Sequence, residues 1–303
     1  MEKQHRYAEW WKATRPFAFP ASTVPVLVGT ATAWVNGGVT ISFFRVALAL
    51  IGVMCLHSGA NIFNDYFDYK RGVDRPGTLG SSGLLVNKTL SPRELFYMGI
   101  VYTSAGVVIG VVLTVLAGPL VLWLGIAGVA GGYCYTGGPA LKYRMLGDLS
   151  VFVFFGLLVT LGAYYIQTGT FSWIPVLYAI PLGFLIDGIL HGNNMRDIAD
   201  DAVVNVTTFA GRLGIKGSQI FYLVLVTGAF VSIPVLVFAD HLPWPVFAVV
   251  LSLPLAVRNI RMVLNHSHVP REQFAFIDAM GAQLQLVFGV LMTLGIVAER
   301  WVN

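Results

Sequence analysis

The stretch VALALIGVMCLHSGANIFNDYFDYKRGVD, residues 46–74, joins a long apolar run to a dense group of amides and acids. A membrane helix needs roughly 20 mostly apolar residues, and the run before Asn61 supplies most of them. An acid in a bilayer is costly unless it faces a polar cavity or finds a partner. The stretch therefore predicts a membrane helix whose polar end requires such surroundings for Asp65, Asp68 and Asp74.

The composition of the whole chain supports a membrane location. Of its 303 residues, 56% are hydrophobic and 11% are charged, whereas a soluble domain carries about 25% charged residues. No polar segment is long enough for a separate soluble domain, so we expect residues 1–303 to form one all-α, polytopic membrane domain. Cys55 and Cys134 show neither a disulfide framework nor a metal-binding spacing. We expect contact with the lipid bilayer, no nucleic-acid partner and no obligate protein partner.

Nine segments are candidate membrane spans. They cover residues 16–35, 42–66, 95–117, 119–137, 147–168, 173–195, 218–239, 243–263 and 275–298. Residues 1–15 lack the apolar core of a signal peptide, and their aromatic side chains Tyr7, Trp10 and Trp11 would share one helical face. We therefore predict that residues 1–15 form a short helix in the membrane interface.

The basic residues predict how the chain is oriented. With nine spans, only Arg45 and Arg300 of the 19 basic residues fall on the side opposite the N-terminus. Cytoplasmic loops carry an excess of Lys and Arg, so we predict a cytoplasmic N-terminus and an external C-terminus. The long loops 67–94 and 196–217 then lie in the cytoplasm and form a polar cap.

Each of these long loops begins with an acidic cluster at the end of a span. On a helix, one face of the first cluster carries His57, Asn61, Asn64 and Asp68. One face of the second cluster carries Asp187, His191, Asn194, Asp197 and Asp201. Three interpretations are open. The acids are solvated charges at loop edges, which suits Asp200 and Asp65; or they pair with Arg71, Arg75 and Arg196; or the two faces meet across a cavity and hold divalent cations.

The third interpretation predicts a specific chemistry. Asp and Asn oxygens are hard ligands that suit Mg²⁺, which usually completes its coordination shell with phosphate oxygens and water. Acids flanked by Arg and Lys at the mouth of a membrane cavity therefore indicate a diphosphate substrate with an apolar tail. Bound metal would neutralise the charge that develops on the leaving diphosphate.

The chain resembles the UbiA superfamily of intramembrane prenyltransferases. NDYFD at residues 64–68, with Asp74, and Asp197-x3-Asp201 are similar to the two aspartate motifs of that family. Further matches resemble the menaquinone branch, the 1,4-dihydroxy-2-naphthoate polyprenyltransferases. They are RPFAFPASTVPVLVG at 15–29, YTGGP at 135–139, LGDLSVFVFFG at 146–156, NNMRD at 193–197 and Leu213-Gly214. This resemblance implies nine transmembrane helices around a central cavity with a cytoplasmic cap.

The resemblance also implies an activity and a set of site residues. It implies Mg²⁺-dependent ionisation of a polyprenyl diphosphate, with two ions, and alkylation of an aromatic quinone precursor by the allylic cation. The residues expected to hold Mg²⁺ are Asn64, Asp68, Asp74, Asp197 and Asp201. The residues expected to bind substrate are Arg15, Arg75, Tyr135, Lys142, Asn61, Asn193 and Arg196. The acids expected to take part in catalysis are Asp68, Asp197, Asp65 and Asp187.

Some roles stay open at this point. Asp65 is a ligand, a base or a solvated neighbour, and Asp187 either pairs with His191 or assists removal of the acceptor proton. Asp148 either caps its helix or faces the acceptor, and His57 is expected to be a hydrogen-bonded core histidine. Residues 202–208, AVVNVTT, lack the basic residues that relatives of this branch carry there, which leaves the acceptor open.

Two other functions compete with aromatic prenyl transfer. The first is prenyl transfer to a non-aromatic lipid acceptor such as a glycerol phosphate. The second is secondary transport, because transporters also contain intramembrane acids. Transporters, however, place their coupling sites near the bilayer midplane on broken helices. Here the acids gather at the ends of two spans on one side of the membrane, which favours the enzyme.

Overall fold

The computed structural model describes residues 2–302, and all of its regular elements in that range are helical. The elements are α1 (Glu2–Ala13), η1 (Pro16–Ala18), α2 (Pro20–Val35), α3 (Phe43–Lys70), α4 (Pro92–Ala117), α5 (Leu120–Thr136), η2 (Leu141–Arg144), α6 (Gly147–Val151), η3 (Phe152–Leu158), α7 (Val159–Thr168), α8 (Ile174–Val203), α9 (Phe209–Phe238), η4 (Trp244–Ser252), α10 (Leu253–Leu264), η5 (His266–His268), α11 (Arg271–Phe274) and α12 (Ile277–Val302). The expectation of an all-α, multi-pass membrane protein is confirmed.

Within the described residues, eight helical stretches are long and apolar enough to cross a membrane. Several of them join consecutive elements, such as Gly147–Thr168, which contains α6, η3 and α7. The remaining predicted span, residues 119–137, forms α5, an apolar helix of 17 residues. A helix of this length is at the lower limit of about 17–25 residues for a span, so the count of nine spans stays a prediction.

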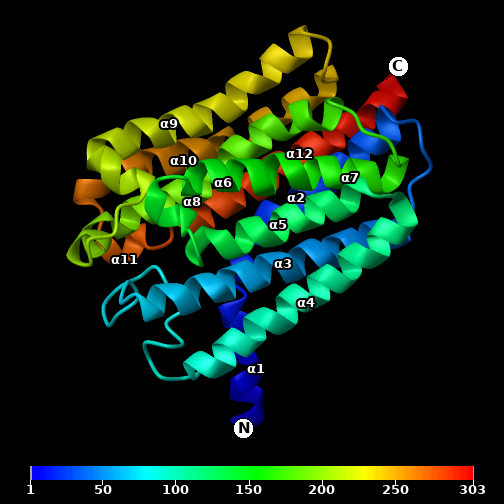
Figure 1. Cartoon of the computed structure of the whole chain (residues 1–303). Coiled ribbons are helices and arrows are strands. Elements are labelled where there is room, and N and C mark those ends of the chain that lie inside the picture. The colour runs from blue at the N-terminus through cyan, green and yellow to red at the C-terminus, as the bar shows by residue number, and fades with distance from the viewer. Residues whose placement is uncertain (1, 303) are drawn as a thin grey trace.

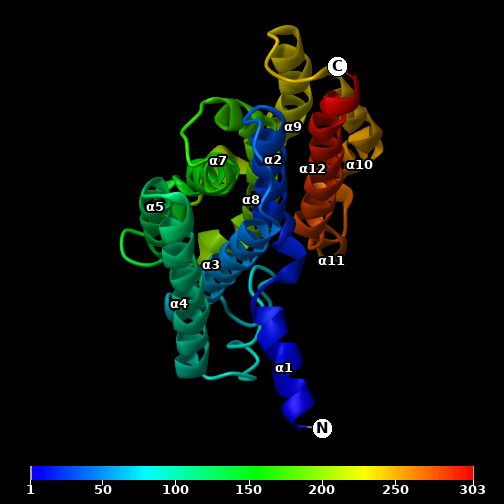
Figure 2. The same cartoon turned by 90° about the vertical axis from the view of Figure 1, so that its right-hand side faces the viewer.

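The helices form a bundle with two parts (Figures 1 and 2). Helices α3, α4 and α5 pack together on one side, and α2, α8, α9 and α12 pack together on the other. Helix α1 extends away from the bundle, and its Tyr7 and Trp11 are exposed. An interfacial helix needs aromatic side chains that are free to contact lipid, and α1 has them. Its location in the membrane interface stays a prediction.

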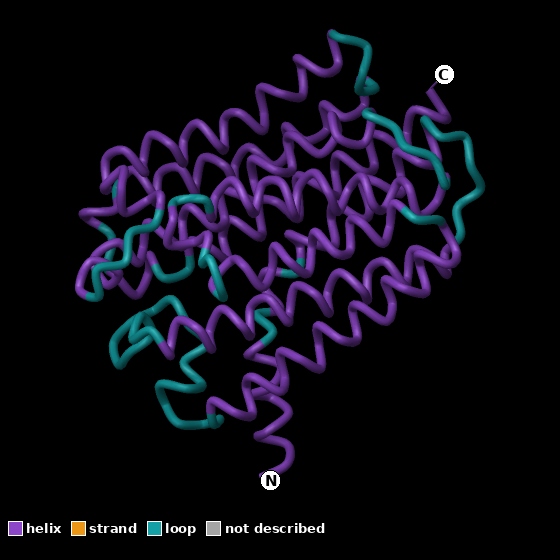
Figure 3. The backbone as a smooth tube through the Cα atoms, viewed as in Figure 1, coloured by secondary structure: helices purple, strands orange, loops and turns teal. Residues whose placement is uncertain are grey.

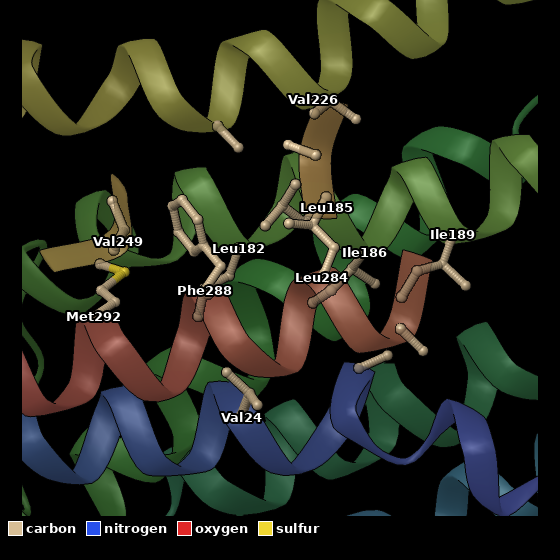
Figure 4. Packing of buried hydrophobic residues seen from close by; sticks show 14 of the residues in the cluster. Val24, Leu182, Leu185, Ile186, Ile189, Val226, Val249, Leu284, Phe288 and Met292 are labelled. Carbon is tan, nitrogen blue, oxygen red and sulfur yellow. The ribbon is translucent and has the colours of Figure 1, made fainter. Parts of the chain in front are cut away.

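The largest core lies between α2, α8, α9 and α12 (Figure 4). Val24, Leu182, Val226, Phe288 and Met292 meet there, and each is almost completely buried. Burial of such side chains contributes roughly 1.5–3 kcal/mol each when the alternative is water, but lipid tails are as apolar as these side chains. Close packing therefore fixes α8 against α2 and α12.

A close approach of two glycines joins η3 to α8. A Cβ atom on Gly156 would lie 2.8 Å from the Cα atom of Gly183, so only a residue without a side chain fits there. Small residues allow membrane helices to approach closely. Residues 152–158 adopt a π-helix, and Phe154 and Phe155 of this segment line the central cavity.

The structure corrects the two predicted cap loops. Helix α3 continues to Lys70 and α4 begins at Pro92, after a capping box formed by Ser91 and Glu94, so the first loop covers only residues 71–91. The second prediction is wrong for most of residues 196–217, because α8 continues to Val203 and α9 begins at Phe209.

The reason for the second error is the polar composition of the segment. Asp197 and Asp201 fall in the predicted loop, but both keep the helical spacing of α8. Asp197 pairs with Arg196, and Asp201 is 4% exposed, so neither depends on solvent. The helix breaks only at residues 204–208 and again at Gly214, which has a φ of 67°. The α3–α4 and α8–α9 loops lie at the same end of the bundle (Figures 1 and 3).

At the opposite end, two arginines close the C-terminal ends of helices. Arg45 donates to the carbonyl oxygens of Leu116 at 2.7 Å and Ile166 at 2.9 Å, in the last turns of α4 and α7. Arg300 donates to the carbonyl of Trp34 at 2.8 Å, in the last turn of α2. Cations at helix C-termini satisfy free carbonyls and the helix dipole.

Candidate active site

A partly open cavity of about 200 Å³ lies in the bundle, with polar groups at one end and apolar walls at the other. Its polar lining residues include Arg15, Asn61, Asn64, Tyr135, Lys142, Asn193 and Asp278. Its apolar lining residues include Val53, Leu56, Phe154, Phe155, Ile186 and Leu190. Six of the predicted site residues therefore line one cavity, although they come from separate parts of the chain.

The acids at the end of α3 are paired with basic and hydroxyl groups. Lys142 donates from Nζ to Asp68 at 2.7 Å, and the Tyr143 hydroxyl donates to the other oxygen of the same carboxylate. The side chains of Lys142 and Asp68 are 11% and 3% exposed, so solvent does little to screen the pair. Burial alone lowers the pKa of Lys142, but Asp68 and the neighbouring tyrosines raise it well above its usual value.

Asp65 is also a paired, buried acid. Its carboxylate accepts from the guanidinium of Arg15 and from the backbone N–H of Ser82 at 3.1 Å. The same guanidinium donates to the carbonyl of Gly80 at 2.8 Å. Arg15 thus ties the start of the first span to α3 and to the 71–91 loop. The interpretation of Asp65 as a solvated charge is wrong, because it is 2% exposed.

Asn64 and Asp74 complete the first cluster. Asn64 lines the cavity, and its buried Oδ1 atom has no hydrogen-bond partner within the described residues. Gly72, with a φ of 72°, turns the chain after α3 so that Asp74 folds back and its N–H lies 3.3 Å from the carbonyl of Asp68. Burial, followed by the charges of Asp65 and Asp68, raises the pKa of Asp74 to about 8.

The second cluster is held by Arg196. This arginine, 4% exposed, donates from Nε and Nη2 to the two carboxylate oxygens of Asp197 at 2.8 and 2.9 Å. It also donates from Nη1 to Asp278 at 3.1 Å and from Nη2 to Asn193. The structure therefore places Arg196 between two acids rather than in the lining of the cavity. Pairing with Arg196 was one of the alternatives left open by the sequence, and it is correct for Asp197.

The two clusters meet at the polar end of the cavity. Lys142 contacts Asp68 and lies within electrostatic range of Asp201, while Asp201 lies within range of both Asp68 and Asp197. Gly80 of the 71–91 loop approaches Asp197, since a Cβ atom there would lie 2.7 Å from its Oδ2. Acids that are more than 120 residues apart in the sequence thus form one charged site.

The similarity of this chain to known proteins supports the interpretation of the site. The profile of the UbiA prenyltransferase family matches residues 22–280. The chain belongs to the UbiA prenyltransferase family. The resemblance found in the sequence is confirmed, and the chain is accordingly a prenyltransferase.

Individual UbiA relatives agree with this assignment. UbiA prenyltransferase domain-containing protein 1 of Homo sapiens is 31% identical over 97% of this chain and 85% of the relative. The 1,4-dihydroxy-2-naphthoate octaprenyltransferase of Mycobacterium tuberculosis is 35% identical over 83% of this chain and 85% of the relative. The solved UbiA homolog from Archaeoglobus fulgidus, bound to GPP and Mg²⁺, has a TM-score of 0.59 at 15% identity and covers 94% of this chain and 99% of its own.

Eight of the fourteen predicted site residues of this UbiA protein do not line the cavity. Five are the acids of the two clusters described above, and the other three are Arg75, Arg196 and Asp187. Arg75 donates to the carbonyl of Asp200 at 2.9 Å and to that of Val73 at 3.2 Å, so it holds the 71–91 loop against α8. Arg196 lies between its acids, as described above. Asp187 is buried beside Asp148.

Of the two alternatives left open for Asp187, the structure does not show the pairing with His191. His191 instead contacts Asp148 through Nδ1 at 2.7 Å, which links α8 to α6. Asp148 lies in the first turn of α6, near the N-terminal end of the helix dipole, as one of the two expectations for it required. The one-turn spacing of Asp187 and His191 indicated a local pair, but the tertiary packing of α6 supplies a partner that sequence spacing does not reveal.

Sequence reasoning missed two residues of the UbiA site. Tyr143 binds Asp68 but follows Lys142 in a short 3₁₀ turn, where no helical period places it on a face. Asp278 lines the cavity from α12 and lies 82 positions from its partner Arg196. The signal that was available for Asp278 is that it is an acid in the first turn of a membrane helix.

Proposed function

We propose that this UbiA-family enzyme transfers a polyprenyl group from a prenyl diphosphate to an aromatic quinone precursor of the dihydroxynaphthoate type. The observation that carries the proposal is the meeting of two acidic clusters with Lys142 and Arg15 at the polar end of an apolar cavity. Such a cavity accommodates a substrate with a charged head and an apolar tail. The naphthoate octaprenyltransferase among the relatives supports the choice of acceptor.

The residues at the cavity mouth suit Mg²⁺. Among the described residues, no group of three His, Cys, Asp or Glu side chains is already arranged around a metal position, because resident cations pair with several of the acids. The available donors are nevertheless hard oxygen atoms, and the orphaned Oδ1 of Asn64 lacks a partner. The proposed ligands are Asn64, Asp68, Asp74, Asp197 and Asp201, with two ions. Bound Mg²⁺ would supply charge neutralisation for the leaving diphosphate.

The basic residues of the cavity provide the rest of the diphosphate site. Lys142 and Arg15 line the cavity and carry charges that can turn from their acids to phosphate oxygens. The hydroxyl of Tyr135 is buried, lines the cavity and has no hydrogen-bond partner within the described residues, so it can donate to the same group. These groups bind and orient the diphosphate. We propose catalytic roles for Asp68 and Asp197 through the metal site and a supporting role for Asp65 through Arg15.

The apolar walls protect the reactive prenyl cation. Phe154 and Phe155 line the cavity together with Val53 and Leu56, so a prenyl chain bound there would displace water from apolar walls. Aromatic faces attract cations, and a water-free cavity favours transfer to the acceptor over hydrolysis. We further propose that the polar end faces the cytoplasm, since it is the end at which the basic residues gather.

The test uses purified enzyme in lipid nanodiscs with Mg²⁺, a radiolabelled polyprenyl diphosphate and a panel of acceptors. We expect a prenylated aromatic product with a dihydroxynaphthoate, and none with EDTA or with the Asp68→Ala/Asp197→Ala variant. Prenylation of a glycerol phosphate alone would contradict the proposed acceptor. Diphosphate binding that survives both EDTA and the double variant would contradict the proposed metal site.

A further inference from the structure

A buried histidine in the cavity has no role in the diphosphate site. His57 lies on α3 and lines the cavity, with 7% of its surface exposed. It is seven residues before Asn64, which corresponds to about 10 Å along a helix that rises 1.5 Å per residue. The rings of Phe155 and Phe19 lie 4.8 and 6.0 Å away, centroid to centroid. His57 is therefore in the aromatic part of the cavity, about two helical turns from Asn64 and within electrostatic range of Arg15.

One ring nitrogen of His57 is fixed by a serine. Nδ1 lies 3.1 Å from Oγ of Ser22, and the same Oγ lies 3.1 Å from the carbonyl oxygen of Phe19. A hydroxyl has one hydrogen and a carbonyl can only accept, so donation from Ser22 to Phe19 requires Nδ1–H to donate to Ser22. In this arrangement Nε2 carries the free lone pair. Nε2 makes no hydrogen bond within the described residues and is not among their fully enclosed polar atoms, so it has access to the cavity.

The other charged groups of the cavity lining are already engaged, and the unpaired hydroxyl of Tyr135 is a far weaker base than an imidazole. Arg15 and Lys142 are cations bound to acids. Asp278 accepts from Arg196 at 3.1 Å with one oxygen and from the N–H of Ala279 at 2.7 Å with the other. Asp187 and Asp148 do not belong to the lining. His57 is thus the cavity group with a lone pair that is available to accept a proton.

We propose that His57 is the general base of the transfer and accepts the hydroxyl proton of the aromatic acceptor at Nε2. This inference rests on the proposed function. A histidine base needs to lie within hydrogen-bond reach of the proton, and Phe155, which lines the cavity next to the imidazole, can hold an aromatic ring beside it. Ser22 acts as a positioning residue, because it fixes the tautomer and orientation of the imidazole.

The proposed step balances without an oxidant. The bond between the allylic carbon and the diphosphate oxygen breaks, and its electron pair leaves with the diphosphate. A ring carbon of the acceptor forms the new C–C bond as its hydroxyl oxygen becomes a carbonyl and the hydroxyl proton moves to Nε2. The products are the keto form of the prenylated ring, diphosphate and an imidazolium. The ring then regains aromaticity by losing a proton or carbon dioxide from the alkylated carbon.

The experiment compares His57→Gln and Ser22→Ala with the wild type. Ser58→Ala is the matched control, because Ser58 is a buried neighbour that donates to Met54 within its own helix. Transfer rates are measured with a series of acceptors whose hydroxyl groups differ in pKa. The affinity for prenyl diphosphate is measured in the presence of Mg²⁺ with a thiolo analogue, whose carbon–sulfur bond to the diphosphate is not cleaved. We expect His57→Gln to lower kcat by about 10²-fold or more, with the affinity for the analogue within about twofold. The loss should shrink for acceptors that are already ionised at the assay pH.

Each result decides between the alternatives. A general base contributes about 10²–10⁴-fold to the rate. The assignment of His57 as the base would be overturned if His57→Gln kept a kcat above about a third of the wild-type value. It would also be overturned if the loss of kcat were the same for every acceptor. If His57→Gln does not fold, His57→Asn takes its place under the same criteria, and Ser22→Ala should lower kcat without changing the affinity for the analogue. If the wild type prenylates no aromatic acceptor, the proposed function itself fails. If the wild type and His57→Gln are equally active, only the role of His57 fails.

Discussion

Replacement of Lys142 by Met should tighten the binding of Mg²⁺ while weakening the binding of diphosphate. Lys142 and Asp68 form a buried ion pair with an N–O distance of 2.7 Å, and Met keeps the length of the side chain without its charge. Loss of one partner of a buried pair costs about 3–5 kcal/mol. Since Tyr143 still donates to Asp68, we expect a loss of metal-free stability near the lower end, about 3 kcal/mol.

Mg²⁺ then takes the place of the lost cation. If metal binding recovers half of about 3 kcal/mol, the affinity for Mg²⁺ rises about tenfold, because 1.4 kcal/mol corresponds to a factor of ten. The diphosphate loses one charge-assisted hydrogen bond, which contributes about 1.5–3 kcal/mol, so its affinity falls by about tenfold or more. The two ligands thus respond with opposite signs to one substitution.

The assay titrates Mg²⁺ and diphosphate separately into the purified variant by calorimetry and follows thermal unfolding with and without the metal. Lys70→Met is the control, because Lys70 is exposed at the end of α3, the helix of Asp68, and should change neither affinity. An unchanged or weaker affinity of Lys142→Met for Mg²⁺ would refute the idea that a resident cation competes with the metal for Asp68.

Three further outcomes follow from other contacts. Burial raises the pKa of Asp74 to about 8, so below pH 8 its carboxyl keeps a proton that Mg²⁺ must displace. The affinity for Mg²⁺ should therefore rise by up to about tenfold per pH unit below pH 8 and level off above it. Asp278→Asn leaves Arg196 bound mainly to Asp197 and should weaken Mg²⁺ binding, measured by the same titration. Gly156→Ala places a Cβ atom 2.8 Å from Gly183 and should lower the free energy of unfolding by about 1–3 kcal/mol, measured by denaturant titration.

Each of these outcomes has its own control. A flat pH profile of Mg²⁺ affinity between pH 6 and 8 would contradict the protonated state of Asp74. The effect of Asp278→Asn should vanish in an Arg196→Gln background, and its persistence there would mean that Asp278 acts on the metal directly. Gly110→Ala is the control for Gly156→Ala, because no atom lies within 4 Å of the added Cβ and the helix should not lose stability.

The membrane helices and the residue types of the site followed from the sequence because both depend on local patterns. Apolar length predicts spans, and the helical period brought Asn64 and Asp68 to one face. The predicted span ended at residue 195 because the apolar sequence ends there, whereas α8 continues to Val203 and Asp197 pairs with the adjacent Arg196. Nothing local could indicate that Asp278 meets Arg196 from another helix, since that contact depends on tertiary packing.

The sequence also could not decide what His57 does. Its position among apolar residues is typical of a core histidine, and its hydrogen bond to Ser22 agrees with that expectation. Only the cavity, formed by segments from separate regions of the chain, shows that the imidazole also borders the space in which a substrate ring would lie. His57 is therefore a buried residue that, under our proposal, also acts on the substrate.

Arg45 and Arg300 have a further consequence for how the chain is inserted into the bilayer. Under the proposed orientation they are the two basic residues that must be carried across the membrane, which insertion disfavours. Both are bound to free carbonyl oxygens at the ends of α2, α4 and α7. Their removal would ease translocation but leave those helix ends unpaired. The two arginines therefore make insertion of the chain less favourable, while they stabilise the helix ends on the external side of the folded bundle.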